Sequence, residues 1–473
     1  MWYNCVVKAT IKTKTKEISH MAIITQDLSD EKCRSESILQ FAENFKLGNL
    51  LAQANIRKVN GIGVLTLFIN LLSVCFSGKS LNQLLNSDDL GGKKDTFYRF
   101  INSASANWYK FIRLLSSMAI SYLLKCADLQ YEYVPQIPVL ILDDTIHKRN
   151  RSKHVELLAW VKDHNDGRNY RGFRCLTMGF HNGDTFIPVD FRILSSQKKD
   201  IRINEMQSNL DKRTTAYKNR KCAISNTYDM AFQMVQKHTT PARHVLFDSW
   251  FSEPVMFKTL RKMDMHGIGM LKARKGSFYR FKSKTYALET LYAQVKHLIP
   301  SEHCFVTVGV ELMDGTPFSI TFVNDKRNKR DWLAVGTTDL SLSGKQVISL
   351  YSRRWSIEVF FKTVKSCLGF AKECQSRSFN AILCSVAVVF TRYIMLAWQN
   401  QGLPIPESDC QLFIRLCEEM HKCTFVEALE IVFRELQVLF VHFDDMLELS
   451  VKDFLSRLPC CLNPLHSLAI CET

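Results

Sequence analysis

The 473-residue sequence lacks the features of a secreted protein and of a protein stabilised by structural zinc. Its 16 cysteines form no CxxC pair and mostly lie in apolar stretches, as reduced core residues of a cytoplasmic protein do. The C-terminal group Cys460, Cys461, His466 and Cys471 lacks the spacing of known zinc sites. The first 20 residues are polar and Lys-rich, unlike a secretory signal, and Met21 is an alternative start. We therefore expect a cytoplasmic protein.

Long uninterrupted apolar runs are also missing. The run at 61–76 is shorter than the roughly 20 residues that cross a bilayer. The run at 379–398 is interrupted by Asn380, Ser385, Thr391 and Arg392. Both runs predict buried core helices, and no membrane partner is expected.

Acidic residues are the minority among the charged side chains. Lys and Arg number 62 against 46 Asp and Glu, giving a net charge of +16, which favours a polyanionic partner such as DNA. The basic residues are spread over segments that include 149–153, 197–202, 211–221, 272–284 and 324–332. Although any one segment is more typical of a solvated loop, the set predicts a broad surface that follows phosphates.

A polar helical face is predicted near residues 351–370, which read YSRRWSIEVFFKTVKSCLGF. Tyr351, Arg354, Glu358 and Lys365 stand at offsets of 0, 3, 7 and 14, and at about 100° per residue these fall on one narrow face of a single helix. A carboxylate flanked by cations suits metal-assisted chemistry on a phosphate backbone. Taken alone, the pattern fits equally well a solvated face with an ion pair between Arg354 and Glu358. An apolar stripe beside it would pack on a core: Ile357, Phe361, Val364 and Leu368.

Two short apolar runs each end in aspartate. The run at 139–142 leads into Asp143 and Asp144, and the run at 244–247 leads into Asp248. Open α/β sheets place ligand-binding groups at such strand ends, although a single Asp there is more often a turn former or helix N-cap. With Glu358 they supply three carboxylates, the usual number for two divalent metals roughly 3.5–4 Å apart. Because residues 139–142 are all apolar, alternation does not choose between Asp143 and Asp144.

The order of predicted elements is that of an RNase H-like α/β fold. Residues 1–135 read as mostly helical, with a Gly-Gly-Lys-Lys break at 91–94. There follow strands at 139–144, about 173–181 and about 185–193, the last two joined by an Asn-Gly turn. A helical stretch at about 204–238, a strand to Asp248, a helix from about 253 and a strand at 267–272 come next. The sequences HCFVTVGVEL and PFSITFVND, before Glu358, are β-rich.

The spacing Y-(2)-R-(3)-E-(6)-K resembles that of the DDE transposases of bacterial insertion sequences, in the branch defined by this signature. The resemblance spans roughly residues 90–400, including NRSKHVELLAWVKDH, GFRCLTMGFHNGDTFIPVDFRIL, DSWFS and DWLAVGTTDLSLSGKQVISLYSRRWSIE. It implies an RNase H-like catalytic core interrupted by a β-rich insertion domain, between helical N-terminal and C-terminal regions. We expect a DNA-binding region at 1–135, core at 136–272 and 345–400, the insertion at 273–344 and a C-terminal region at 401–473.

The resemblance also implies an activity and its residues. The chain would bind the ends of its own insertion sequence, cut there, and join the freed 3′-hydroxyl to target DNA. Asp144, Asp248 and Glu358 would be the catalytic metal ligands, with Asp144 preferred because the family's first Asp commonly precedes Thr or Ser. Mg²⁺ is the expected ion because carboxylates are hard ligands, and Mn²⁺ would substitute.

Further expectations concern DNA contacts and partners. By resemblance, Tyr351, Arg354 and Lys365 hold phosphates of the transposon end. Trp332 either stacks on a flipped base or is a core residue of a strand, and Trp355 is expected to pack. The partners would be double-stranded DNA, namely terminal inverted repeats and target, bound by a homodimer associated with the bacterial nucleoid. The alternatives are an inactive or domesticated sequence-specific DNA-binding protein and a metal-dependent nuclease without strand transfer.

Overall fold

The computed structural model describes residues 36–421, except for 59, 87–92, 129–135, 164–165, 275, 300–303, 325–331, 374 and 404. The group of Cys460, Cys461, His466 and Cys471 lies outside the described residues. Residues 409–421 are helical. The predicted N-terminal helices are confirmed for the described part: α2 (Glu36–Asn44), α3 (Leu47–Gln53), α4 (Val64–Ser73), α5 (Leu81–Asn86), α6 (Lys94–Ile101) and α7 (Trp108–Asp128).

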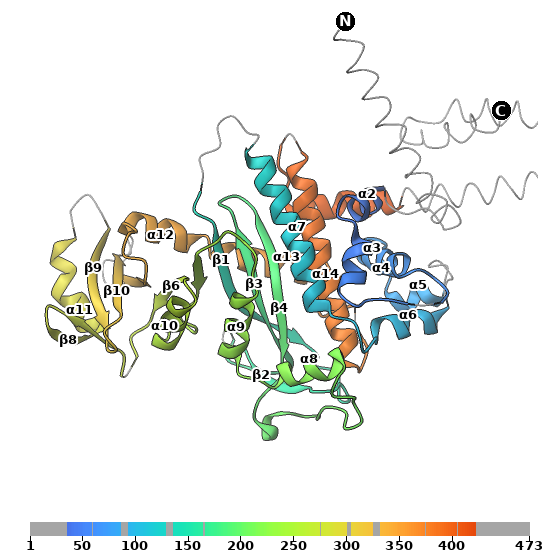
Figure 1. The fold of residues 1–473 in the computed structure, drawn as a ribbon, viewed down its shortest axis with the longest axis horizontal. Helices are drawn as coiled ribbons and strands as arrows, with labels where there is room; N and C mark the ends of the chain where they lie inside the picture. The colour runs from blue at the N-terminus through green and yellow to red at the C-terminus, as the bar shows by residue number, and fades with distance from the viewer. Residues whose placement is uncertain are drawn as a thin grey trace, which may run out of the picture.

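A mixed sheet forms the centre of the molecule (Figure 1). β1 (Val139–Lys148) pairs antiparallel with β3 (Asn169–His181), which pairs antiparallel with β4 (Phe186–Leu194). On its other edge β1 pairs parallel with β5 (His244–Phe247), and β5 pairs parallel with β6 (His266–Leu271). The apolar runs form these strands because they are buried, as residues 139–142, all of β4 and all of β5 are. The order and directions are consistent with the predicted RNase H-like fold.

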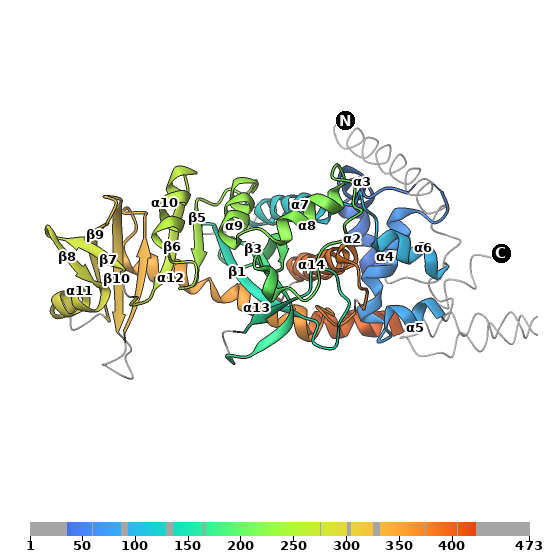
Figure 2. The same ribbon diagram turned by 90° about the horizontal axis from the view of Figure 1, so that it is seen from below.

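The β-rich stretch after β6 extends the same sheet. It contains β7 (Phe278–Phe281), β8 (Lys284–Ala287), α11 (Leu288–Val295), β9 (Phe305–Leu312), β10 (Pro317–Asn324) and β11 (Trp332–Thr337). β11 pairs antiparallel with β6 on one edge and with β10 on the other. These strands therefore continue the sheet toward one end of the molecule, as both ribbon views show (Figures 1 and 2).

The predicted helical stretch at about 204–238 consists of two shorter helices. α8 (Thr215–Ala223) begins after Thr214, whose side chain accepts a hydrogen bond from a backbone N–H of the first turn. α9 (Thr227–Gln236) begins after Asn226, which caps it in the same way. The helical prediction is wrong before Thr215, where residues 204–214 form bends and turns.

The apolar run at 379–398 forms α14 (Phe379–Gln401), a core helix that packs against α7 and β4 (Figure 1). α14 is long and apolar enough to cross a membrane, but 89% of its most apolar 18-residue window is buried inside the protein. Arg392, in its middle, donates to the carbonyls of Leu71, Leu72 and Leu368 and to Glu373. These contacts satisfy a fully buried guanidinium, so the prediction of a core helix is confirmed.

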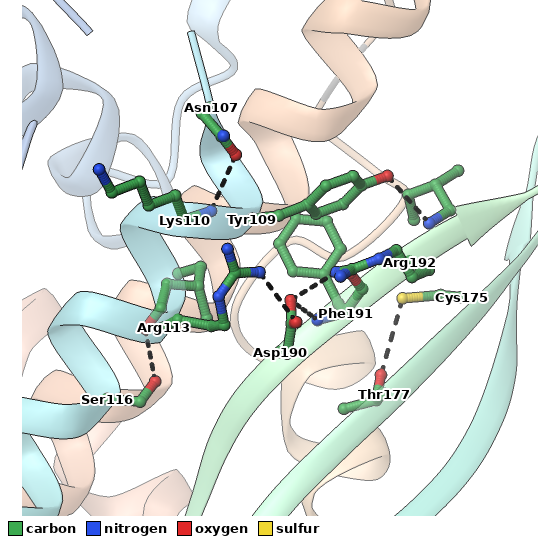
Figure 3. Close-up of polar contacts among 12 residues, drawn as sticks. Asn107, Tyr109, Lys110, Arg113, Ser116, Cys175, Thr177, Asp190, Phe191 and Arg192 are labelled. Atoms are coloured by element: carbon green, nitrogen blue, oxygen red, sulfur yellow. Dashed lines mark hydrogen bonds and ion pairs between the residues drawn. The ribbon is translucent and has the colours of Figure 1, made fainter. Parts of the chain in front are cut away.

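A buried charged cluster joins α7 to the sheet (Figure 3). Asp190 on β4 is completely buried and accepts from Arg113 of α7 at 3.0 Å and from Arg192 of β4 at 2.6 Å. The ring of Tyr109 on α7 lies 4.9 Å from that of Phe191 and 4.4 Å from the Arg192 guanidinium. Two cations thus satisfy one buried carboxylate, and the pair between Arg113 and Asp190 links α7 to β4 of the central sheet.

Candidate active site

β1 and β5 bring two aspartates to the same level of the sheet. In this parallel pair Leu142 is in register with Phe247, and Asp143 and Asp248 are the next residues. The prediction that Asp143 and Asp144 end a strand is wrong, because β1 continues to Lys148 through its pairing with β3; they follow the last residue that pairs with β5. Neighbouring strands lie about 4.8 Å apart, and successive side chains point to opposite faces. Asp143 therefore lies beside Asp248, whereas Asp144 points to the other face.

The helix with the third carboxylate differs from the single helix predicted. α12 (Gly344–Ser352) and α13 (Trp355–Ser366) are separate helices. At Arg353 and Arg354 the backbone N–H groups bond to carbonyls three residues back, which tightens the turn between the helices. Tyr351 thus belongs to α12, and the other three signature residues belong to α13 or its N-cap.

Arg354 connects α13 to β1. Its Nη1 donates to Oδ2 of Asp143 at 3.1 Å, and its Nη2 donates to Oε1 of Glu358. The ion pair between Arg354 and Glu358 is therefore present, but it is shared with a strand-borne carboxylate. The Arg354 guanidinium thus lies between Asp143 and Glu358, two of the candidate metal ligands.

Asp144 has a different basic partner. Nη1 of Arg174, on β3, donates to Oδ2 of Asp144 at 2.5 Å. The Arg174 guanidinium carbon lies 5.6 Å from the ring centre of Trp250, whose backbone N–H donates to Oδ1 of Asp248 at 3.0 Å. Sequence reasoning missed Arg174 because its contact depends on the register of β3 with β1, which leaves no local signal.

The electrostatics of the site centre on Asp143. Burial, together with the carboxylates of Asp144 and Asp248, raises the pKa of Asp143 to about 8, although Arg354 lowers it. Burial also raises the pKa of Tyr351 to about 12, so its hydroxyl stays protonated at neutral pH. The acidic groups are therefore close enough to repel one another in a poorly hydrated place.

Lys365, the last of the four signature residues, lies on α13 seven residues after Glu358. Burial lowers the pKa of its ammonium, and the nearby Asp163, Cys175 and Asp143 oppose this effect. Its Nζ lies 5.9 Å from the Phe361 ring. Lys365 and Tyr351 both feel the charge of Asp143. Of the four signature residues, Arg354 contacts Asp143 directly, Tyr351 and Lys365 are close enough to feel its charge, and Glu358 shares Arg354 with it.

The donor chemistry of the site fits a hard divalent cation, although the carboxylates do not form a finished cage. Within the described ranges, no group of three His, Cys, Asp or Glu side chains is arranged to hold a metal ion. Asp143, Asp144, Asp248 and Glu358 offer the oxygen ligands that Mg²⁺ prefers. The charges of Asp144 and Asp248 disfavour the ionised form of Asp143, an effect that such a cation would relieve and that Arg354 already opposes.

The two tryptophans of interest are placed differently from each other. Trp332, at the start of β11, is partly buried and stacks on Tyr292 with the ring centres 4.5 Å apart. These contacts fit the core alternative, and its role on DNA stays a prediction. Trp355 was expected to pack, but it is 63% exposed beside Arg354. That expectation is wrong because α13 turns this residue away from the apolar stripe that faces the core.

Comparison with known protein families agrees with this geometry. Residues 64–284 match the DDE superfamily endonuclease family, and residues 217–395 match the transposase DDE domain. No curated protein matches the chain. The first match spans β1 and β5, and the second spans β5, α12 and α13. The two matches support a DDE transposase family for this chain, with the nuclease-type activity and DNA substrates that such a family implies.

Proposed function

We propose that this protein is a DNA transposase that binds the ends of its own insertion sequence, cuts DNA there and transfers the freed 3′-hydroxyl to target DNA. The observation that supports this most is the contact of Arg354 with both Asp143 and Glu358, beside Asp248. The first family match covers Asp143, the second covers Glu358, and both cover Asp248. The Tyr-Arg-Glu-Lys branch remains part of the proposal.

The roles of the residues follow from their chemistry. Asp248, Glu358 and one of Asp143 and Asp144 would hold Mg²⁺ or Mn²⁺, which supplies Lewis acidity and an activated oxygen nucleophile when bound. Arg354 and Lys365 would bind phosphates, and the protonated hydroxyl of Tyr351 would donate to a phosphate oxygen. Cutting two ends together favours a homodimer assembled on DNA.

A nuclease without strand transfer has the same residues, so the test must detect joining. We would incubate the full chain with Mg²⁺, a duplex carrying the DNA that flanks its gene, and a plasmid target, and then sequence the products. Ends joined to the plasmid are the expected result. Cut ends that are never joined would indicate a nuclease, and specific binding without cutting would indicate an inactive or domesticated DNA-binding protein.

Substitution of Asp248 tests the carboxylate assignment. Asp248→Asn should retain DNA binding and lose cutting by several orders of magnitude, because a neutral amide is a poor ligand for a hard cation. Asp211→Asn is the matched control, since Asp211 is an exposed partner of Arg213 outside the site. Undiminished cutting by Asp248→Asn, or cutting in excess chelator, would refute the assignment.

The neighbouring aspartates are separated by the same assay. The resemblance assigns Asp144, so Asp144→Asn would abolish cutting and Asp143→Asn would cost much less. The register of β1 with β5 and the contact with Arg354 favour Asp143, which would reverse the two results. Because strand neighbours point to opposite faces, we expect only one of the two variants to be inactive.

A further inference from the structure

A groove lies along the edge of β3, where its pairing passes from β2 (Ala159–Lys162) to β4. Its volume is about 820 Å³, within the range of about 300–1,000 Å³ that small ligands occupy. The lining side chains that offer stacking, charge or hydrogen bonds to a ligand are Trp160, Lys162, Asn169, Arg174, Gln197 and Thr227. None of them was assigned a role by the sequence motifs.

The outer end of the groove offers an aromatic ring and a positive charge. Trp160 is 48% exposed, which is unusual for the largest apolar side chain on a strand. The guanidinium carbon of Arg171 lies 5.6 Å from its ring centre. Lys162 is exposed two residues along β2, so it projects from the same face as Trp160. An exposed ring beside cations is the arrangement on which unpaired bases stack.

The inner end of the groove lies beside Asp144, one of the two candidate first ligands, and near the loop that follows Asp248. Arg174 lines the groove and also donates to Asp144. The same guanidinium lies 5.6 Å from Trp250, in the loop that follows Asp248. The amides of Asn169 and Gln197 and the hydroxyl of Thr227 also line the groove and provide hydrogen-bonding groups. A strand held near Asp144 and Asp248 would therefore have this groove beside it.

We propose that the groove binds an unpaired stretch of the DNA strand next to the cleavage point, with a base stacked on Trp160 and its phosphate near Lys162. This inference rests on the proposed function and adds a binding site to it. The volume suits one or two nucleotides better than a duplex. The bases of a duplex are stacked on each other and would not stack on the Trp160 ring. Asp200 is the acidic residue among the groove's lining residues, so the lining is net positive.

The test measures the affinity of the full chain for a labelled dT20 oligonucleotide and for a blunt duplex of equal length, by fluorescence anisotropy without divalent metal. Trp160→Ala should weaken dT20 binding by about fivefold or more, as expected for a lost base–aromatic stack, and change duplex binding less than twofold. Trp160→Phe should restore most of the affinity. Lys162→Ala should reduce the salt slope of dT20 binding by about 0.7, the loss of one single-strand phosphate contact.

Two control variants match these changes outside the groove. Tyr122→Ala removes a 40% exposed aromatic ring on α7. Lys237→Ala removes an exposed charge at the far end of α9, about 15 Å along the helix from Thr227. A loss of dT20 affinity in the controls equal to that of the groove variants, or none in Trp160→Ala and Lys162→Ala, would overturn the inference. Duplex binding and cutting would remain intact in that case, whereas a failure of the proposed function would abolish them in the wild-type protein.

Discussion

Arg354 shares one positive charge between two carboxylates that come from different elements, Asp143 on β1 and Glu358 on α13. A metal ion and Arg354 would therefore compete for the same negative charge, whereas a DNA phosphate would compete with the carboxylates for Arg354. Binding of DNA and of metal should consequently favour each other. A phosphate that binds Arg354 frees the carboxylates for the metal ion, and a metal ion that binds the carboxylates frees Arg354 for the phosphate.

Replacement of Arg354 tests this competition. Arg354→Ala should bind Mn²⁺ without DNA more tightly than the wild type, by about tenfold or about 1.4 kcal/mol, because the site becomes more negative. The same variant should bind duplex DNA more weakly. Titration followed by electron paramagnetic resonance measures the free Mn²⁺. Arg243→Ala, which removes an exposed arginine paired with Asp264, should change neither affinity. Unchanged or weaker Mn²⁺ binding by Arg354→Ala would contradict the competition.

The buried His147, four residues after Asp143 on β1, should make the stability of the protein depend on pH. Its ring is fully buried 5.1 Å from that of Phe370, and burial, with a further contribution from Arg149, lowers its pKa to about 3. The unfolded chain takes up this proton near pH 6.5, well before the folded chain does. Stability should therefore fall as pH decreases from about 6.5 toward about 3.

Denaturant unfolding of His147→Phe at several pH values checks this prediction. The wild type should lose up to about 1.4 kcal/mol more per pH unit than the variant near pH 5, the value for one proton. His297→Gln, which changes an exposed histidine, should keep the wild-type slope. Equal slopes for the wild type and His147→Phe would show that His147 is not held neutral.

At the scale of elements, the contact between α7 and β4 should depend on Asp190 (Figure 3). Asp190→Ala leaves Arg192 buried and Arg113 partly buried without their carboxylate, and removing one partner of a buried pair costs about 3–5 kcal/mol. Thermal or denaturant unfolding measures the loss. Asp211→Ala breaks an exposed pair with Arg213 and should change stability little. A small effect of Asp190→Ala would mean that the apolar contacts of α7 alone fix it on the sheet.

At the scale of the whole molecule, the charge of +16 predicts how DNA binding responds to salt. Log affinity for a duplex should fall linearly with log salt, with a slope of about 0.9 per phosphate neutralised, because counterions are released. The cutting-deficient Asp248→Asn variant keeps the DNA intact during the measurement. A steep slope is expected from basic segments spread over the chain. A slope near that of one or two contacts would instead indicate a compact recognition arm.

Much of the architecture could be predicted because it depends on local patterns. The short runs at 139–142 and 244–247, mostly apolar and followed by turn-forming residues, predicted β1 and β5, because such runs are typical of buried strands. The strands β3, β4, β9 and β10 followed from β-branched and aromatic content and from turn residues. The spacing of the signature residues predicted that Glu358 and Lys365 share a helix.

The separation of α12 from α13 could not be read from the spacing. Arg353 and Arg354 keep φ and ψ values in the right-handed helical region, so the period of the side chains barely changes across the turn. Only the change from hydrogen bonds four residues apart to bonds three residues apart ends one helix and begins the next.

The sequence by itself determined which residue types reach the site: aspartates that follow two buried apolar runs, a helical glutamate, and the basic residues around them. The tertiary structure decided which of them meet. Asp143 lies beside Asp248 and contacts Arg354, and Asp144 contacts Arg174, because β1 is in one register with β5 and in another with β3. A strand buried on both faces has no alternation to reveal its orientation, so that choice depends on pairing partners about 30 and 100 residues away in the chain.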